Sequence, residues 1–442
     1  MARTYFRLAA FFVILAALLN PPFMIADETN HFFRAVQISQ GGLIGERLPH
    51  GEAGGMLAEP VVNFGYGFDA LRFDPAARAT LQHLRFSFQK RWRDEVVAAN
   101  FPNTVIYPPQ FYLPAALTLT FTRQLHLRVL QAFYIARLAS GLICVALSAF
   151  ALRICAPSAR PWLLFCLSLP EVTGLYGSLS QDGPFIMCAA LAGALLTREQ
   201  RQRELSGATA LLAVFVSAKP PYWPLLALPL ILAARPRRRF AALLVLLGLA
   251  TVLAWCVFGL RPLVTPVRHG DVSPSRQLHY LFLHPGLIPR LFAATFIKGG
   301  PSLMAGAVGT VGWIEATLPR WVYALVLGTG LLAASLYVAS LPRRWEWRLA
   351  LLGLAVGAAG AGVALSTYLT WDEVGQTNIE GLLGRYFIPL LLCLTPAASW
   401  AGPGWNRRFA LPWLSRWLLY GLMPLANLFY LRGVFLRFWW PS

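Results

Sequence analysis

The chain has 442 residues, of which 57% are hydrophobic and only 13% are charged. A soluble domain carries about twice that share of charged residues, so the composition excludes an ordinary soluble protein. The formal net charge of +19 would suit a nucleic-acid-binding protein. However, the arginines occur in short clusters between apolar runs, as in the cytoplasmic loops of membrane proteins. We therefore expect no nucleic-acid partner.

The apolar runs predict an all-α polytopic membrane protein that forms one integral membrane domain over residues 1–442. A helix needs about 20 apolar residues to cross a bilayer. By that measure we expect about eleven transmembrane helices, within a range of about 10 to 13. The expected spans cover residues 6–26, 129–152, 161–180, 183–197, 205–218, 222–234, 240–260, 321–341, 349–371, 385–401 and 411–431.

The first run ends in PPFMIADETNHFFRAVQISQGG, which places Asp27 and Glu28 side by side. Because Arg3 and Arg7 precede this run, the N-terminus is expected in the cytoplasm. The two acids then emerge at the extracytoplasmic face. They open a long polar stretch, residues 27–107, which we interpret as a large first extracytoplasmic loop with interfacial helices.

The packed set DETNHFFRA is the strongest candidate site. If a helix continues past Asp27, then His31 and Arg34 follow at i+4 and i+7 and share its face. A carboxylate beside an apolar mouth suits a general base. The alternative is that Asp27 and Glu28 only cap the next helix, with Arg34 as a solvated partner. The density of polar groups favours function.

The next apolar segment, YPPQFYLPAALTLTF, is short and interrupted by prolines. If it crossed the membrane, every later basic cluster would lie outside. We therefore predict that it does not cross. The clusters then fall in the cytoplasm: Arg153 with Arg160, REQRQRE, RPRRRF, PRRWEWR and WNRRF.

Three ionisable residues follow in apolar surroundings. Arg137, in YIARLASG, lies two turns into a helix and is either a structural latch or a ligand contact. Glu171, in LSLPEVTG, lies inside an apolar run, where an ionisable residue indicates a site; the alternative is an early end of the helix near the surface. Asp182, in SLSQDGPF, begins a helix and is either a site residue or an N-cap.

Lys219 lies in SAKPPYWP, at a helix break made by two prolines. A cation on a rigid turn at the membrane edge suits a phosphate, although a lysine there also snorkels to the interface. A second extracytoplasmic stretch is expected over residues 261–320. Within it, RQLHYLFLHPGLIPRLF has the character of an interfacial helix.

Two further motifs lie near the end of the chain. TWDEVGQTN repeats the adjacent acids as Asp372 and Glu373, without a histidine or arginine at helical spacing. EGLLGRYFIP places Arg385 and Tyr386 at a helix mouth, where an arginine fork suits a phosphate or pyrophosphate. The alternative is an interfacial anchor. On the predicted topology, independent segments bring acids and bases to one membrane face.

In order along the chain, DETNHFFRA, YPPQFYLP, SLSQD, KPPY and GRYFIP resemble the motifs of an uncharacterised bacterial family of predicted membrane proteins. That family is related to the GT-C superfamily of membrane glycosyltransferases. The resemblance covers nearly the whole chain. It implies a GT-C-like fold and the transfer of a sugar, with inversion, from a polyprenyl-phosphate-linked donor.

The resemblance also implies roles for individual residues. Asp27 would be the general base, with Glu28 beside it, and Lys219 and Arg385 would neutralise the leaving phosphate. The expected catalytic set is Asp27 and Glu28, and the expected substrate-binding set is His31, Arg34, Arg137, Asp182, Lys219, Arg385 and Tyr386. No cofactor is required. Mg²⁺ or Mn²⁺ on Asp27 and Glu28 stays open, since paired carboxylates suit hard cations.

The implied partners are the lipid-linked donor, an acceptor that is a glycan, lipid or protein, and membrane lipids. The implied location is the bacterial inner membrane, as a multi-pass protein. Two other functions remain: a transporter or flippase of lipid-linked sugars, and a non-catalytic membrane subunit of polysaccharide assembly. A transporter would need charged sites near the midplane and a repeat relating two halves.

Overall fold

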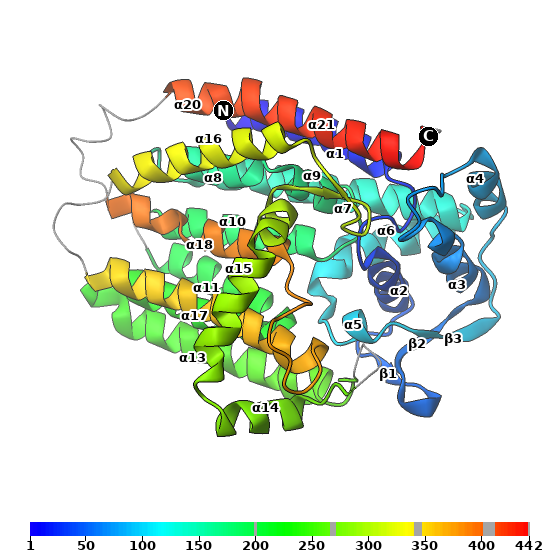
Figure 1. Ribbon diagram of the computed structural model, residues 1–442, viewed down its shortest axis with the longest axis horizontal. Coiled ribbons are helices and arrows are strands. Elements are labelled where there is room, and N and C mark those ends of the chain that lie inside the picture. The colour runs from blue at the N-terminus through cyan, green and yellow to red at the C-terminus, as the bar shows by residue number, and fades with distance from the viewer. Residues whose placement is uncertain (199–200, 266–270, 340–346, 401–411, 441–442) are drawn as a thin grey trace.

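The computed structural model describes residues 1–198, 201–265, 271–339, 347–400 and 412–440. Within these residues the chain is mostly helical. Figure 1 shows the long helices α16, α17 and α21 running in roughly the same direction, with the short elements α2–α5 and β1–β3 gathered at one end. The predicted basic clusters REQRQRE, PRRWEWR and WNRRF each include residues outside the described ranges.

Six helical stretches in the described part are long and apolar enough to cross a membrane, by length and composition. They are Ala2–Leu19, Val129–Ile154, Arg235–Leu260, Leu287–Val308, Trp347–Trp371 and Pro412–Phe438. Three shorter apolar stretches accompany them: Asp182–Leu196, Pro220–Leu232 and Arg320–Leu336. These helices confirm the predicted class, an all-α polytopic membrane protein.

The elements of the bundle have the following bounds. They are α1 (Ala2–Leu19), α6 (Leu113–Gln124), α7 (Val129–Ile154), α8 (Arg160–Leu167), α9 (Pro170–Tyr176), α10 (Asp182–Leu196), α11 (Gln202–Ala218), α12 (Leu228–Leu232), α13 (Arg238–Trp255), α14 (Pro274–Leu283), α15 (Leu287–Val308), α16 (Arg320–Ala339), α17 (Trp347–Trp371), α18 (Ile388–Cys393), α20 (Pro412–Trp417) and α21 (Met423–Phe438).

Three of the expected spans are interrupted. The span expected at 161–180 forms α8 and α9, and the one expected at 222–234 forms the 3₁₀ helix Pro220–Ala227 followed by α12. The span expected at 385–401 begins as the 3₁₀ helix Gly384–Phe387 and continues as α18. Each interruption lies at a proline, which lacks an N–H for the helical ladder. The breaks matter because Lys219 and Arg385 lie at two of them.

The first loop folds into more than the surface helices that were expected. Its helices are α2 (Glu28–Ser39), α3 (Glu59–Tyr66), α4 (Leu81–Phe88) and α5 (Pro102–Val105), and its strands are β1 (Glu46–Arg47), β2 (Ala53–Ala58) and β3 (Val96–Asn100). The three strands pair antiparallel in the order β1-β2-β3. The sheet returns the end of the loop, and with it α5, to the side of α2.

Aromatic packing fixes the start of this loop on the bundle. The ring of Phe133 on α7 lies 4.8 Å from that of Phe23 and 5.3 Å from that of Phe32. Phe64 of α3 completes the group, 4.9 Å from Phe23. All four side chains are buried. Burying each aromatic side chain stabilises the fold by about 2 kcal/mol, so the segment carrying Asp27 is held rigidly.

Two segments bear on the predicted topology. Helix α6 has 12 residues, which cover roughly 18 Å at about 1.5 Å per residue, too little to cross a bilayer. In the stretch 261–320, α14 is followed by α15, whose 22 residues are enough for a crossing. In Figure 1, however, α15 runs across the direction of α16 and α17. A hairpin of β4 (Thr310–Val311) and β5 (Ala316–Thr317) follows.

Candidate functional site

Asp27 lies between α1 and α2 in an unusual backbone conformation. Its φ is 67°, in the left-handed region, which aspartate tolerates better than most residues. Although it is the N-cap residue of α2, its side chain makes no capping hydrogen bond. The carboxylate is instead held by Asn103 Nδ2, which donates to Oδ1 at 3.1 Å, and by Arg385 Nη2, 2.9 Å from Oδ2. Capping therefore does not explain this residue.

Arg385 joins Asp27 to a second acid. Its Nε lies 2.9 Å from Oδ2 of Asp182, which begins α10. The preceding residue, Gly384, allows this placement because a Cβ there would lie 1.9 Å from the carbonyl oxygen of Leu303 on α15. Only glycine permits so close an approach between the two backbones.

Asp182 also binds Lys219, whose Nζ lies 2.6 Å from its Oδ1. Lys219 follows the last residue of α11. The four side chains therefore form one continuous chain of ion pairs, Asp27–Arg385–Asp182–Lys219. The members come from four distant segments, and the structure thus brings together four residues that were singled out separately in the sequence.

Tyr386 covers the two cations. Its ring centroid lies 4.4 Å from Lys219 Nζ and 5.8 Å from Arg385 Cζ, within cation–π range. Its carbonyl oxygen accepts a hydrogen bond from Tyr222 Oη at 2.7 Å, which fixes the 3₁₀ turn. Tyr386 thus shapes the ion-pair cluster.

Exposure separates the two acids of the cluster. The side chain of Asp27 is 30% exposed, whereas that of Asp182 is 9% exposed. Of the two cations, Lys219 is 15% exposed and Arg385 is 5% exposed. Asp27 is therefore the most accessible charged group of the cluster.

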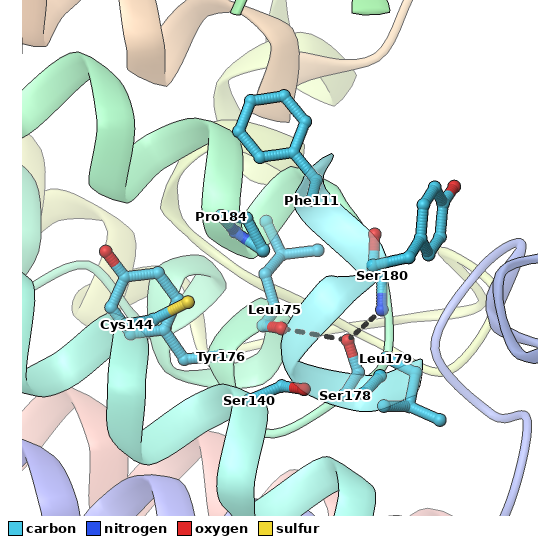
Figure 2. A pocket seen from close by; sticks show the side chains of 11 residues that line it. Phe111, Ser140, Cys144, Leu175, Tyr176, Ser178, Leu179, Ser180 and Pro184 are labelled. Carbon is cyan, nitrogen blue, oxygen red and sulfur yellow. Dashed lines mark hydrogen bonds between the residues drawn. The ribbon is translucent and has the colours of Figure 1, made fainter. Parts of the chain in front are cut away.

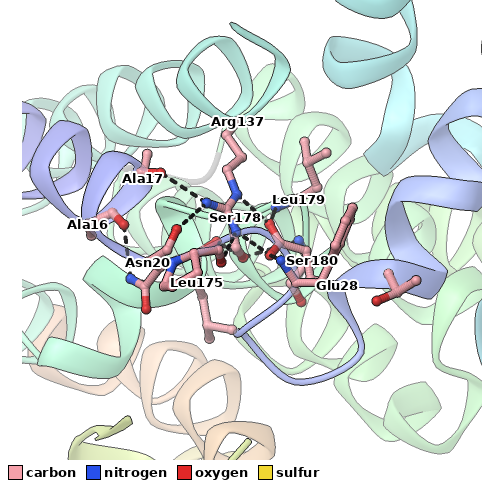
Figure 3. Close-up of polar contacts among 12 residues, drawn as sticks. Ala16, Ala17, Asn20, Glu28, Arg137, Leu175, Ser178, Leu179 and Ser180 are labelled. Carbon is pink, nitrogen blue, oxygen red and sulfur yellow. Dashed lines mark hydrogen bonds and ion pairs between the residues drawn. The ribbon is translucent and has the colours of Figure 1, made fainter. Parts of the chain in front are cut away.

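Glu28 has a different environment from Asp27, and Figure 3 shows it beside Arg137 and Leu179. It is completely buried, and Arg137 approaches both carboxylate oxygens, with Nε 2.7 Å from Oε1 and Nη2 2.5 Å from Oε2. The backbone N–H groups of Phe23 and Leu179 also donate to it. With four donors and no exposed surface, Glu28 is placed as a structural group, although the sequence predicted a catalytic one.

All the hydrogen-bond donors of Arg137 are likewise engaged within the protein. Besides its bidentate contact with Glu28, it donates to the carbonyl oxygens of Ala17, Asn20 and Pro21. An arginine has five N–H donors, and these contacts occupy all of them. The sequence left Arg137 as a latch or a ligand contact, and the geometry favours the latch, which ties α7 to the end of α1.

Arg34 also serves the backbone. It is fully buried and donates to the carbonyl oxygens of Tyr107, Gly42 and Leu43, and to the side chain of Gln37. These contacts pin the end of α2 to the segment before α6. The structure therefore does not bring Arg34 together with Asp27 as a substrate-binding pair, because its five donors are already engaged.

His31 lies on the face of α2 expected from the spacing. Its Nδ1 is 2.8 Å from Tyr112 Oη, and its ring stacks on that of Tyr107. Burial lowers the pKa of His31 to about 4, although the negative charges of Asp27 and Asp182 favour the protonated form. The imidazole is neutral at neutral pH and acts there as a hydrogen-bonding group, not as a cation.

Some residues around the site were missed in the sequence. Asn103 bridges Asp27 and Asn30, and nothing in its neighbourhood, FPNTV, signals this. Tyr107 and Tyr112 lie in the YPPQFY segment, which contributed to the family resemblance but was given no role for its rings.

The second pair of adjacent acids lies apart from the cluster. Asp372 is buried and accepts a hydrogen bond from the N–H of Glu380 at 3.2 Å.

A metal site is not formed by the adjacent acids, because Glu28 is committed to Arg137. Among the described residues there is no group of three or more His, Cys, Asp or Glu side chains arranged for a metal ion. A narrow cavity does lie beside the start of α10, lined by residues that include Ser140, Cys144, Ser178 and Ser180 (Figure 2). Its hydroxyl groups suit water more than an ion.

Comparison with known proteins places the chain in a family. Residues 10–394 match the family model described as "Predicted membrane protein (DUF2142)". No curated protein and no solved structure gives a significant match. The matched range covers nearly the whole chain and includes every residue of the ion-pair cluster. This chain therefore belongs to the DUF2142 family of predicted membrane proteins.

Proposed function

We propose that the protein is an inverting glycosyltransferase of the extracytoplasmic membrane face, which moves a sugar from a polyprenyl-phosphate-linked donor to an acceptor hydroxyl. The observation that carries the proposal is the cluster Asp27–Arg385–Asp182–Lys219, in which one carboxylate is open to a substrate. Acids and bases at the end of a membrane bundle suit chemistry on a lipid-linked phosphate.

Asp27 is the general base of the proposed reaction. It removes the proton of the acceptor hydroxyl as the acceptor oxygen bonds to the anomeric carbon. The bond between that carbon and the phosphate oxygen breaks, and its electron pair leaves with the polyprenyl phosphate. One displacement inverts the anomeric centre. A positioned base of this kind contributes about 10²–10⁴-fold to the rate.

Arg385 links the base to the leaving group. As Asp27 gains a proton it loses its negative charge, and Arg385 is then free to stabilise the charge that develops on the phosphate. Lys219 supplies a second cation nearby, beside the ring of Tyr386. In the resting structure both cations are paired with acids, so a phosphate has to compete with Asp27 and Asp182 for them.

The test is acceptor-dependent release of polyprenyl phosphate by the purified full chain in detergent, from mixed lipid-linked sugars. Asp27→Asn is the critical variant, and Asp94→Asn is the matched control because Asp94 is fully exposed in the same loop. Release that needs acceptor and is lost only in Asp27→Asn supports the proposal. Absence of release, with lipid-linked sugar crossing proteoliposomes, contradicts it and favours a flippase.

A further inference from the structure

A second cavity adjoins the ion-pair cluster on the side of α9 and α21. Its lining includes Arg385 of the cluster, Glu171 of α9, Tyr430 of α21, and Ile314 at the tip of the β4–β5 hairpin. Because Arg385 contacts both the cavity and Asp27, a ligand here would lie beside the proposed base.

Glu171 differs from the other acids at this end of the molecule. Asp27, Glu28, Asp182 and Glu315 each have an arginine or lysine nitrogen within 2.9 Å. Among the described residues, Glu171 has no such ion pair, and the hydrogen bond that it accepts from the N–H of Thr310 is long, at 3.3 Å. A 9% exposed carboxylate without a paired cation is costly to keep ionised, so Glu171 either takes up a proton or binds another partner.

The remaining polar groups of the cavity suit a hydroxyl-bearing ligand. Tyr430 Oη accepts a hydrogen bond from Asn20 Nδ2 at 3.4 Å, so its own proton can be given to a ligand. Glu171 accepts hydrogen bonds, and Arg385 donates them. In its ionised form, Glu171 repels a phosphate. The cavity therefore fits the uncharged, hydroxylated part of a substrate better than the phosphate itself.

The roof of the cavity is strained. Ile314 has φ 63°, a conformation that a β-branched side chain rarely adopts, and its side chain is 40% exposed. The hairpin is tied down on both sides of this tip: Trp313 Nε1 donates to the carbonyl oxygen of Phe23 at 2.9 Å, and Glu315 pairs with Arg437. The cavity is narrow as it stands, so binding of a sugar ring would require the tip and these two contacts to shift outward.

We propose that this cavity is the donor-sugar subsite, in which Glu171 and Tyr430 bind the sugar hydroxyls under the Ile314 tip. The assignment rests on the proposed function, since that function supplies a lipid-linked sugar as the ligand. It adds Glu171 as a residue that recognises the sugar, separate from the cations that face the phosphate.

The experiment measures binding to the purified full chain by competition against a fluorescent polyprenyl phosphate. The competitors are bare polyprenyl phosphate and the same lipid carrying glucose, galactose or mannose. We expect Glu171→Gln to weaken binding of at least one sugar-bearing lipid about tenfold and to leave the bare lipid unchanged. Lys219→Met, in contrast, should weaken both. Equal effects of Glu171→Gln on both lipids, or none on either, would overturn the subsite.

A second variant guards against a folding artefact. Ile314→Gly relieves the left-handed strain, so the fold should be at least as stable, yet removal of the apolar roof should still weaken the sugar-bearing lipid selectively. Unchanged binding of the sugar-bearing lipid by this stable variant would contradict the claim that Ile314 covers the sugar. Sugar-selective binding without acceptor-dependent release would support the sugar subsite and contradict the proposed glycosyltransferase activity. The two proposals can therefore fail separately.

Discussion

The guanidinium of Arg385 lies 2.9 Å from the carboxylate of Asp27, although 358 positions separate them in the sequence. Arg385 also reaches Asp182, so one arginine connects the most accessible acid of the cluster to the most protected one. This contact makes the ion pairs a single unit. It also means that a change in the charge of Asp27 directly alters the electrostatic environment of Arg385.

Asp182→Asn should destabilise the protein by about 3 kcal/mol, because it removes the paired acid of Lys219 and leaves Arg385 with Asp27 alone. The same variant should gain affinity for phosphate, since an anion then replaces the lost carboxylate. Thermal unfolding with and without pyrophosphate measures both effects. If pyrophosphate raises the Tm of the wild type as much as that of the variant, the cations do not form a phosphate site.

Arg137→Met should cost about 3–5 kcal/mol of stability, because Glu28 is left as an isolated buried charge. The double variant Arg137→Met with Glu28→Leu should not recover stability, unlike many buried ion pairs. The reason is that the pair also satisfies two backbone N–H groups and three carbonyl oxygens. Chemical unfolding of the two variants checks this; recovery to wild-type stability would refute the latch.

The protein should lose stability as the pH falls from 6.5 towards 4. The pKa of His31 is lowered by burial to about 4, whereas an unfolded histidine titrates near 6.5. Between these values the unfolded state binds more protons, so its population rises as the pH falls. This group contributes up to about 3 kcal/mol. The free energies of unfolding of wild type and His31→Gln, plotted against pH, should converge at low pH. A constant difference between them at every pH would contradict this role of His31.

Asn103→Ala should lower kcat about tenfold and leave KM for the donor nearly unchanged. Asn103 donates to Asp27 and holds the carboxylate in place, but it lies outside the proposed phosphate and sugar contacts. The matched control is Asn63→Ala, which removes an exposed side chain from the same loop. A rise in KM with constant kcat would mean that Asn103 binds substrate and does not position the base.

Turnover should persist in excess EDTA. Glu28 is engaged by Arg137, so the adjacent acids Asp27 and Glu28 do not offer two carboxylates to one ion. In the proposed reaction, the cations Arg385 and Lys219 take the part that a metal plays in other enzymes acting on phosphates. Loss of activity on chelation, restored by Mg²⁺ or Mn²⁺ and not by Ca²⁺, would contradict this prediction.

The fold class and the four members of the ion-pair cluster could be predicted from the sequence, because apolar run length and proline breaks are local signals. Asp27, Asp182, Lys219 and Arg385 each lie where an apolar run begins or ends, and such ends meet at one side of a bundle. The sequence does not show which acid pairs with which base. That depends on packing across hundreds of residues.

Glu28 illustrates why the rest could not be predicted. It is adjacent to Asp27 in sequence, but the left-handed turn at Asp27 sends the two side chains to different places. A helix drawn straight through Asp27 also placed Arg34 beside the site, whereas its donors are taken by carbonyl oxygens of the loop. Composition does not reveal such backbone partners. The small sheet was missed because β1 has only two residues, and because the segment that carries α3 and α4 separates β2 from β3.

The most direct test of the account is single-turnover transfer from a bound lipid-linked sugar by wild type and Asp27→Asn at equal donor occupancy. We predict that donor binding is retained and that the rate of transfer falls about 10²–10⁴-fold, the contribution of a positioned general base. Transfer by Asp27→Asn at the wild-type rate would show that Asp27 is not the base and would contradict the central claim.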